Sequence, residues 1–206
     1  MDQELLYEWK DRTHDVQIYS SENRDMTARI FPTAKVFGFK SESDPQGTNL
    51  RMGRLAEIGD FCYVNCRGGL EIGDYSHIHA GSKVIGAGGL IIKNYVAVTY
   101  DIMLISGTDR MAGIMTDAVK SPEARNQYLK PILIEDHAYI GSKSIIMPGV
   151  TIGVGAVVQA FSYVSKEKEL KPWTVYGGIP CEERGKREIP EEKWKALKEW
   201  ESYQND

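Results

Sequence analysis

Four ionisable side chains stand where they could take part in chemistry: two histidines and two carboxylates. His77 and His79 are two residues apart, so on an extended strand both side chains project to the same face. Asp109 and Glu123 lie in a stretch, residues 107–131, that follows no regular pattern. Imidazoles and carboxylates readily bind or transfer protons, so the four are candidates for acid–base chemistry or for holding a cationic group.

A six-residue period in the apolar residues indicates the scaffold that positions these groups. From residue 134 onward, an aliphatic recurs at Ile134, Ile140, Ile146, Ile152, Val158 and Val164. The same spacing comes earlier at Ile58, Val64 and Leu70, at Ile72, Ile78 and Val84, and at Ile92, Val98 and Leu104. This period fits neither an ordinary strand, with a period of about 2, nor a helix, with one of about 3.6. It is typical of a parallel β-helix, in which each repeat forms one flat side of a coil and its aliphatic side chain points inward.

Interruptions of the period divide the chain. Residues 1–30 are expected to form an N-terminal helical and irregular segment, and residues 31–165 the β-helix. Residues 107–131 break the repeat, and so long an excursion from a regular scaffold is usually a binding loop. Residues 166–206 are expected to leave the coil as a C-terminal extension. The predicted fold class is therefore all-β, with a long loop and a terminal helix.

That helix is expected from about Pro190 to Tyr203. Proline at the first position and acidic residues in the first turn are typical of a helix start. Trp194, Leu197 and Trp200 recur at helical spacing, which places them on one apolar face. We expect this face to dock on the coil or on a neighbouring subunit.

Composition narrows the partners and the compartment. The chain has 206 residues, 42% of them hydrophobic, and a formal net charge of −4, which gives no reason to expect a nucleic-acid or membrane partner. No apolar run approaches the length of a membrane span, and the acidic start is not that of a signal peptide. Cys62, Cys66 and Cys181 are an odd number, and we interpret them as buried thiols in a reducing cytoplasm.

Two motifs and the hexad run resemble those of a known family. Gly-Ser-Lys-Ser-Ile-Ile-Met-Pro-Gly-Val-Thr-Ile-Gly at residues 141–153 and the closing Tyr-Gly-Gly-Ile-Pro-Cys at residues 176–181 are similar to motifs of the left-handed β-helix, hexapeptide-repeat acyltransferases. The resemblance covers about residues 58–187. It implies a left-handed coil, against the usual right-handed crossover, and a homotrimer with CoA in the groove between adjacent prisms. Other chemistry also occurs on this coil, so function has to be argued from the site.

The interrupting loop resembles a branch of sugar acyltransferases within the family. The similarity rests on Asp-Arg-Met-Ala-Gly at residues 109–113 and on Pro122, Glu123, Tyr128 and Pro131. Members of this branch act in making surface polysaccharides or unusual sugars, and the chain most resembles the type that N-acylates a nucleotide-linked 4-amino-4,6-dideoxy sugar. The resemblance therefore implies acetyl-CoA or another acyl-CoA as cosubstrate and a nucleotide-linked sugar as acceptor.

Asp109 stands about where galactoside and antibiotic acetyltransferases of this family have a catalytic histidine. A carboxylate, with a reference pKa of about 3.9, is a weaker base than an imidazole, with one of about 6.5. A sugar hydroxyl benefits from the stronger base, whereas an ammonium group only has to lose one proton to become nucleophilic. Asp109 therefore favours N-acylation, as the base or as the group that orients the ammonium. The alternative is that Asp109 only forms a turn in Gly-Thr-Asp-Arg.

Three other side chains are alternatives for handling the proton. Glu123 could reach the same acceptor, or be a solvated loop charge. His79 or His77 would face the groove of a trimer as base or acceptor ligand, or be an interface residue without chemistry. With a third ligand from a neighbouring subunit, the histidines would resemble the zinc site of carbonic-anhydrase-type β-helices. No third ligand is evident, so we expect no metal, and we interpret His137 as structural.

The resemblance also implies two groups of CoA-binding residues. The pantetheine arm would meet backbone groups near Gly141, Ser142, Ala160 and Ser162. The candidates for the phosphates are Lys166, Lys168, Lys171 and Arg184, and the candidate for the adenine is Trp173. Relatives often have a basic residue shortly after the closing Gly-x-Pro, where this chain has Glu182. Each lysine has the alternative of being a solvated surface charge.

Two other functions stay open. One is O-acylation of a sugar or antibiotic hydroxyl, which would need a stronger base and would move that role to His77 or His79. The other is a β-helix without catalysis that serves as a scaffold. The long loop with Asp109 and Glu123 argues against a scaffold, because assembly alone has no need of it.

Overall fold

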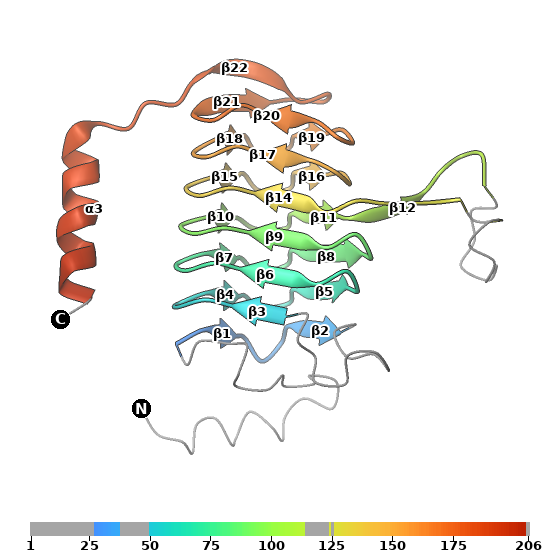
Figure 1. Ribbon diagram of the computed structural model, residues 1–206, viewed down its shortest axis with the longest axis horizontal. Coiled ribbons are helices and arrows are strands. Elements are labelled where there is room, and N and C mark those ends of the chain that lie inside the picture. Colours follow the sequence, from blue (N-terminus) through green and yellow to red (C-terminus); the bar gives the residue numbers. More distant parts are fainter. Residues whose placement is uncertain (1–26, 38–49, 114–123, 125, 205–206) are drawn as a thin grey trace.

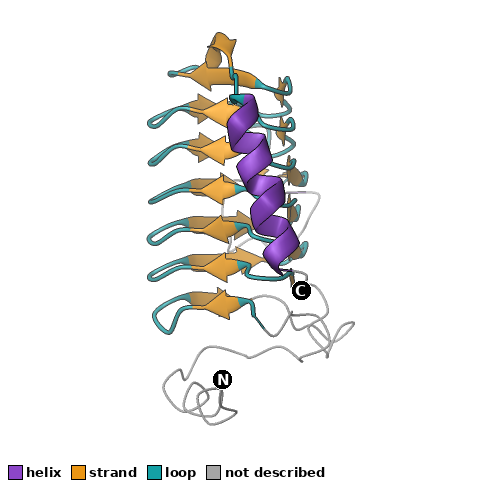
Figure 2. Cartoon of the chain, turned by 90° about the vertical axis from the view of Figure 1, so that its left-hand side faces the viewer, coloured by secondary structure: helices purple, strands orange, loops and turns teal. Residues whose placement is uncertain are grey.

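In the computed structural model the chain forms a left-handed parallel β-helix with one long arm and one C-terminal helix (Figures 1 and 2). The structure describes residues 27–37, 50–113, 124 and 126–204. The helical start expected within residues 1–30 lies outside these ranges, whereas Arg29 and Ile30, at the end of that segment, already form the first strand of the coil. Over the described part of the chain, no helix combines the length and the apolar character needed to cross a bilayer.

Three sheets form the sides of the coil, and successive strands belong to successive sheets. The first sheet contains β1 (Arg29–Ile30), β4 (Glu57–Ile58), β7 (His77–Ile78), β10 (Ala97–Val98), β15 (Tyr139–Ile140), β18 (Val157–Val158) and β21 (Thr174–Gly177). The second contains β2 (Lys35–Phe37), β5 (Tyr63–Cys66), β8 (Lys83–Gly86), β11 (Met103–Ile105), β16 (Ile145–Ile146) and β19 (Tyr163–Val164). The third contains β3 (Leu50–Met52), β6 (Leu70–Ile72), β9 (Leu90–Ile92), β14 (Ile132–Ile134), β17 (Thr151–Ile152) and β20 (Glu169–Leu170).

Parallel pairing places equivalent residues of successive coils beside one another. Ile58 pairs with Ile78, and Ile78 with Val98. Val98 then pairs with Ile140, because the arm is inserted between β11 and β14. The arm, residues 107–131, contains β12 (Gly107–Asp109) and β13 (Gln127–Leu129), which pair antiparallel and project from the corner between the second and third sheets (Figure 1).

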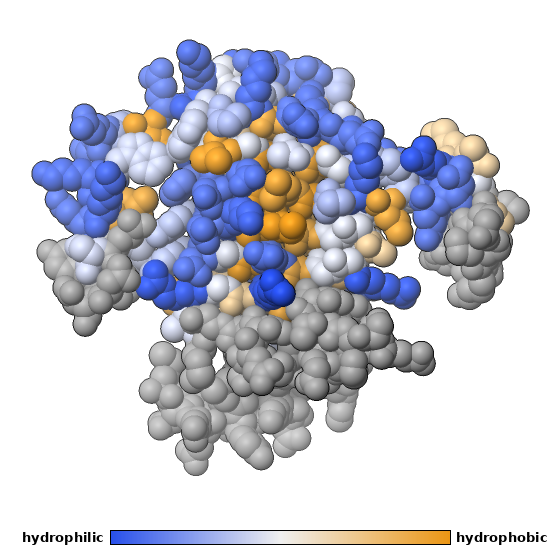
Figure 3. Space-filling model, in the orientation of Figure 1, coloured by the Kyte–Doolittle hydropathy of each residue, from blue (hydrophilic) through white to orange (hydrophobic). Residues whose placement is uncertain are grey.

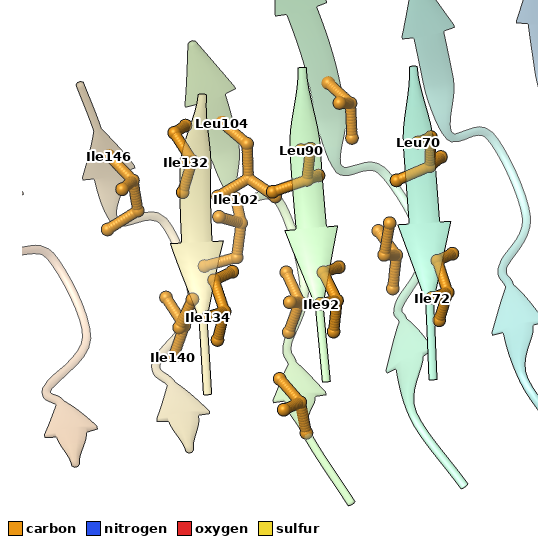
Figure 4. Packing of buried hydrophobic residues seen from close by; sticks show 14 of the residues in the cluster. Leu70, Ile72, Leu90, Ile92, Ile102, Leu104, Ile132, Ile134, Ile140 and Ile146 are labelled. Atoms are coloured by element: carbon orange, nitrogen blue, oxygen red, sulfur yellow. The ribbon is translucent and has the colours of Figure 1, made fainter. Parts of the chain in front are cut away.

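Side chains alternate between the interior and the surface along each strand. On the third sheet, Ile91 and Leu133 point outward and are partly exposed, which gives this face a hydrophobic stripe (Figure 3). Their neighbours Ile92 and Ile134 are fully buried (Figure 4). Burying such a side chain contributes about 1.5–3 kcal/mol, so the stacked aliphatics supply most of the driving force for folding. The predicted fold class is confirmed.

Buried serines satisfy backbone groups where the coil turns. The hydroxyl of Ser76 donates to the carbonyl of Lys93 at 2.6 Å and accepts from the amide of Val96 at 2.9 Å. The hydroxyl of Ser82 accepts in the same way from the amide of Ile102 at 3.2 Å. These bonds join one coil to the next and remove the cost of burying unpaired polar groups at the corners.

The stacked strands continue past residue 165, where the sequence pattern indicated their end. β20 pairs with β17 and β21 with β18. Leu170 and Tyr176 extend the six-residue spacing after Val164, and at 2% and 4% exposure they fill the interior positions. Neither is β-branched, but both are large enough to fill the space. β22 (Glu182–Lys186) then pairs antiparallel with β21 and ends the first sheet.

An aromatic column runs along the corner between the third and first sheets. Several coils each have one residue with a positive φ at this corner: Tyr75, Tyr95, His137 and Trp173. Tyr75 stacks on Tyr95, and Tyr95 on His137, both with ring centroids 5.1 Å apart. The Trp173 ring lies over Gly155, where any side chain would collide with it, and reaches His137 at 6.4 Å. His137 thus has a structural contact, in line with its interpretation.

The C-terminal helix, α3 (Glu191–Gln204), docks on this column (Figure 2). The Trp194 ring makes edge contacts with His137 at 5.2 Å and with Trp173 at 5.6 Å. The Trp200 ring meets Tyr75 edge-on at 5.1 Å. Both the expected helix and its docking on the coil are confirmed.

The three cysteines are free and buried, as expected. Burial raises the pKa of the Cys62 thiol to about 11 and also raises the pKa of Cys66 and of Cys181. A thiol with a raised pKa has little thiolate at neutral pH, so these residues have a packing role and low reactivity.

Candidate active site

A hollow of about 180 Å³ lies on the first sheet, where His77 and His79 project outward. Alternation along the strand turns Ile78 into the core and both imidazoles to the outside. The two imidazole rings lie 4.1 Å apart between centroids, and the His79 ring stacks on Tyr100 at 4.8 Å. Glu57, from the coil below, lines the same hollow. Asp60 also lines it, so the hollow combines two hydrogen-bonding rings, an aromatic face and two acidic residues.

Partial burial keeps both imidazoles neutral at pH 7. Desolvation, with a further effect of His79, lowers the pKa of His77 to about 4. Desolvation also lowers the pKa of His79, although the charge of Glu57 opposes this. Because an imidazole with a pKa of about 4 is a weak base, His77 is better suited to hydrogen bonding than to proton abstraction. Among the described residues, no group of three or more His, Cys, Asp or Glu side chains is arranged to hold a metal ion.

The hollow is one end of a row of residues along the corner between the first and second sheets. The amide of Lys143 donates to the carbonyl of Tyr100 at 3.1 Å, and the amide of Phe161 to that of Ser142 at 2.9 Å. These bonds stack Tyr100, Ser142 and Ala160 on successive coils. Two residues expected to contact pantetheine, Ser142 and Ala160, therefore share a corner with the histidine hollow.

Gly141 keeps this corner flat. A side chain at Gly141 would collide with the backbone of Ala160 on the next coil. Beside it, the hydroxyl of Thr99 lies 3.1 Å from the hydroxyl of Ser142. Ser162, the fourth expected contact, turns its side chain inward and donates to the carbonyl of Gln159 at 2.6 Å. The corner thus offers an even backbone surface on which an extended chain could lie.

Asp109 lies at the base of the arm. It pairs with Gln127, while Thr108 pairs with Tyr128. Because side chains of paired residues share a face of an antiparallel ladder, Asp109 and Gln127 project from one face of the arm and Tyr128 from the other. Asp109 is partly exposed. The arm has no histidine in its sequence, so its base presents a carboxylate and no imidazole.

Within one subunit, the structure does not bring Asp109 to the histidine hollow. The arm leaves the corner between the second and third sheets (Figure 1). His79 directly follows β7 and so lies beside the corner between the first and second sheets. None of the arm's described residues lines the hollow. Glu123 lies outside the described residues, so its place relative to Asp109 stays a prediction.

Two of the expected phosphate contacts are engaged in ion pairs. Lys168 donates to the carbonyl of Cys181 and lies 3.3 Å from a carboxylate oxygen of Glu182. Lys171 pairs with Glu183 at 3.0 Å. Phosphate binding by either lysine would have to compete with these carboxylates.

The other three expected contacts are spread over different sides of the coil. Trp173 lies in the aromatic column beside Trp194. Arg184 donates from Nη2 to the carbonyl of Gly177 at 3.1 Å. Lys166 lies at the base of the arm. Their roles in CoA binding stay predictions.

Four further residues with functional side chains or rings line the hollow and are not indicated by any motif: Phe31, Glu57, Asp60 and Tyr100. Glu57 stands one coil before His77, with which it pairs. A coil length of twenty residues, read from the repeated Gly-Gly-Leu segments, could have indicated Glu57. Tyr100 follows a strand end at a corner, where the sequence gives no signal that distinguishes a site residue from a surface aromatic.

Comparison with known proteins adds to this geometry. Residues 131–166 match the family profile described as hexapeptide repeat of succinyl-transferase. The chain is similar to the dTDP-4-amino-4,6-dideoxy-D-glucose acyltransferase of Escherichia coli, with 33% identity over 144 residues that cover 68% of this chain and 74% of the relative. It is also similar to the galactoside O-acetyltransferase of Escherichia coli K12, with 34% identity over 110 residues that cover 52% of each protein.

A solved structure shares the fold over the whole chain. It is the crystal structure of AntD, an N-acyltransferase from Bacillus cereus in complex with dTDP and 3-hydroxybutyryl-CoA. The TM-score is 0.77 with 22% identity, and the match covers 100% of this chain and 98% of that one. At this identity the likeness concerns the fold.

Proposed function

Because the chain belongs to the hexapeptide-repeat acyltransferase family, we propose that it transfers an acyl group from acyl-CoA to the amino group of a nucleotide-linked deoxy amino sugar. The similarity to the Escherichia coli sugar acyltransferase, over 74% of its length, supports this acceptor. AntD, which shares the fold, has been crystallised with dTDP-4-amino-4,6-dideoxyglucose and coenzyme A. Use of the product in surface polysaccharides and a cytoplasmic location, where buried free thiols stay reduced, belong to the proposal.

The choice of an amine as the acceptor rests on one observation: Asp109 lies at the base of an arm that contains no histidine. Solved AntD structures include variants of a serine and of an aspartate ten positions later. Thr99 and Asp109 have that spacing in this chain. The coincidence supports Asp109 as the residue that handles the amino group.

In the proposed reaction, Asp109 binds the sugar ammonium and accepts its first proton. The free amine then attacks the carbonyl carbon of the thioester, while backbone N–H groups bind the oxyanion. The carbon–sulfur bond breaks, an amide forms, and the CoA thiolate takes up the second proton from nitrogen. The carboxylate needs only to bind the ammonium group and accept one proton from it, so a strong base is not required.

We place the pantetheine arm along the corner formed by Gly141, Ser142 and Ala160. An acyl-CoA in this position would bring its thioester towards the hollow with His79 and Tyr100. The flat backbone of the corner and its stacking on the hollow support this placement. In this arrangement the two histidines contact the acceptor or the acyl group and do not act as the base.

A homotrimer would unite the two halves of the site, with Asp109 of one subunit facing the corner of another. The hollow of about 180 Å³ is smaller than the roughly 300–1,000 Å³ of clefts that enclose small ligands. A second subunit would therefore have to complete it. Along the same corner, Phe61, Tyr100 and Phe161 are 72%, 54% and 63% exposed, as expected for a surface that contacts protein.

Thiol release from acetyl-CoA and longer acyl-CoA tests the proposal. We expect release with dTDP-4-amino-4,6-dideoxy-D-glucose and none above background with its 4-hydroxy counterpart. Asp109→Asn should lower kcat at least tenfold while leaving oligomeric state and CoA affinity unchanged. Glu169→Gln, the same carboxylate-to-amide change on an exposed strand, is the control. Normal turnover by Asp109→Asn would remove Asp109 from the mechanism, and absence of release with every acceptor would favour the scaffold.

O-acylation is the second candidate, favoured by the similarity to galactoside O-acetyltransferase. In that reaction the base would be His79, whose imidazole is neutral at pH 7 and so can accept a proton. Release with the hydroxyl acceptor, abolished by His79→Gln and not by Asp109→Asn, would establish this function in place of N-acylation.

A further inference from the structure

Positive charge gathers around one tyrosine at the base of the arm. The guanidinium carbon of Arg110 lies 4.8 Å from the centroid of the Tyr128 ring, and Nζ of Lys166 lies 5.1 Å from it. Nζ of Lys130 is 5.8 Å away. Arg110 and Lys130 follow the two strands of the arm, while Lys166 comes from a later coil. We call these four residues the Tyr128 cluster.

One carboxylate among the described residues lies beside the Tyr128 cluster. Glu167 forms a salt bridge with Lys130. Neither Arg110 nor Lys166 forms an ion pair with a described residue. The chain as a whole has a net charge of −4, so this local excess of cations runs against the overall sign. Arg110 and Lys166 are therefore held close to one ring without a salt bridge to a described residue, although the charge of Arg110 contributes to the lowered pKa of Glu167.

The hydroxyl of the tyrosine lies beside charged groups in a shielded position. Tyr128 is only 8% exposed, and its shielded hydroxyl makes no hydrogen bond of acceptable geometry to a described residue, although Lys130 and Glu167 lie beside it. A buried hydroxyl without a partner costs stability unless a ligand or water completes it. An anion held by the cations could accept a hydrogen bond from this hydroxyl in competition with the carboxylate of Glu167.

We propose that the Tyr128 cluster binds a diphosphate ester, the group that acyl-CoA and a nucleotide-linked sugar have in common. The guanidinium of Arg110 can form two parallel hydrogen bonds to phosphate, and Lys166 adds a point charge. A ligand with two negative charges would offset the repulsion between these cations, whereas a neutral ligand would not reduce it. The inference rests on the proposed function for the identity of the ligand, since it assigns a phosphate site to the same reaction.

The place of the cluster fits this role. Arg110 directly follows Asp109, and alternation turns their side chains to opposite faces of the arm. One arm would thus hold the diphosphate on one face and present Asp109 to the reacting amine on the other. The alternative is that the cations only stabilise the arm by stacking on the ring, as cation–π pairs do.

Binding of inorganic pyrophosphate, CoA and dTDP, measured by calorimetry on the full chain, separates these two possibilities. The variants are Arg110→Gln, Lys166→Gln and the double variant, with Lys166→Arg to retain the charge. Lys195→Gln, an exposed lysine on α3 away from the arm, is the control. We expect each single loss to weaken pyrophosphate binding about tenfold, since hydrogen bonds to charged groups contribute this much or more. Lys166→Arg and Lys195→Gln should bind as the wild type does.

The two nucleotide ligands identify the source of the diphosphate. If the double variant loses affinity for CoA alone, the cluster holds the acyl donor; if it loses affinity for dTDP alone, the cluster holds the acceptor. Unchanged binding of both by a folded double variant would overturn the proposal and leave the cations as ring-stacking residues. The calorimetric measurement needs no turnover. If the protein releases no thiol with any acceptor, the proposed function is wrong, but the binding data still show whether the Tyr128 cluster binds a diphosphate.

Discussion

His79 lies nearly parallel to Tyr100, with ring centroids 4.8 Å apart and planes inclined by 13°. The stacking follows from the register of the first sheet, in which His77 pairs with Ala97. This register puts His79 beside Thr99, so that Tyr100 can cover the imidazole. The contact fixes the imidazole plane, and any ligand in the hollow therefore meets a hydrogen-bonding edge of set orientation.

Loss of this stacking should weaken acceptor binding more than it slows the chemical step. We predict that Tyr100→Ala raises the KM for the amino sugar about fivefold to tenfold, the equivalent of an aromatic contact of about 1 kcal/mol. Its kcat should stay within about twofold of the wild-type value. Tyr100→Phe, which keeps the ring, is the control. A fall in kcat of about 100-fold or more in His79→Gln would instead identify His79 as the general base.

His77 should make the stability of the protein depend on pH between about 4 and 6.5. Its pKa is about 4 in the folded chain and about 6.5 when unfolded, so below pH 6.5 the unfolded chain binds a proton that the folded chain excludes. The free energy of unfolding should therefore fall as the pH is lowered from 6.5 towards 4. Because His77 is partly exposed, we expect an effect of about 1 kcal/mol.

Urea unfolding at pH 7.5 and pH 4.5 measures this effect. Carboxylates also titrate in this range, so the informative quantity is the difference between wild type and His77→Gln. The variant should lose less stability on acidification. Identical losses in both proteins would show that His77 does not resist protonation.

Alternation along β9 offers a test of the core with a matched control. Ile92 is fully buried (Figure 4). Its neighbour Ile91 points to the surface and is partly exposed. We predict that Ile92→Ala lowers the free energy of unfolding by about 2–5 kcal/mol, through lost burial and a cavity. Ile91→Ala, the same change one residue away, should cost less than about 1 kcal/mol. Equal costs in urea unfolding would contradict the inward and outward assignment.

The fold could be predicted because its cause is repeated along the chain. Every coil has to place an aliphatic side chain at the same interior position, so residues such as Ile72 and Ile92 show the period even where a neighbouring repeat is irregular. The end of the coil was harder to predict, since Leu170 and Tyr176 keep the spacing but are not β-branched. At these interior positions, a large and mostly apolar side chain is enough to fill the coil, and β-branching is not required.

The site could be predicted only in part, because corners bring together residues that no motif connects. The outward direction of His77 and His79 follows from alternation, but Tyr100 and Glu57 join them through the length of the coil. The Tyr128 cluster depends on how the arm folds back against a later coil, and Lys166 has no sequence signal of that contact. Asp109 and the hollow lie apart in one chain, so their relation depends on assembly.

Docking of α3 should depend on its two tryptophans, and on Trp194 more than on Trp200. A helix of 14 residues is marginal alone in water, so its stability comes from packing on the aromatic column. Trp194 makes two edge contacts, with His137 and Trp173, whereas Trp200 makes one and is 40% exposed. At about 0.5–1.5 kcal/mol for each aromatic pair, Trp194→Ala should increase amide hydrogen exchange over residues 191–204 about tenfold or more.

Trp200→Ala should have a smaller effect, and Lys195→Ala, on the exposed face, almost none. The coils have their own core, so exchange in β9 should stay slow in all three variants. Unchanged exchange of the helix in Trp194→Ala would show that contacts other than the column hold α3.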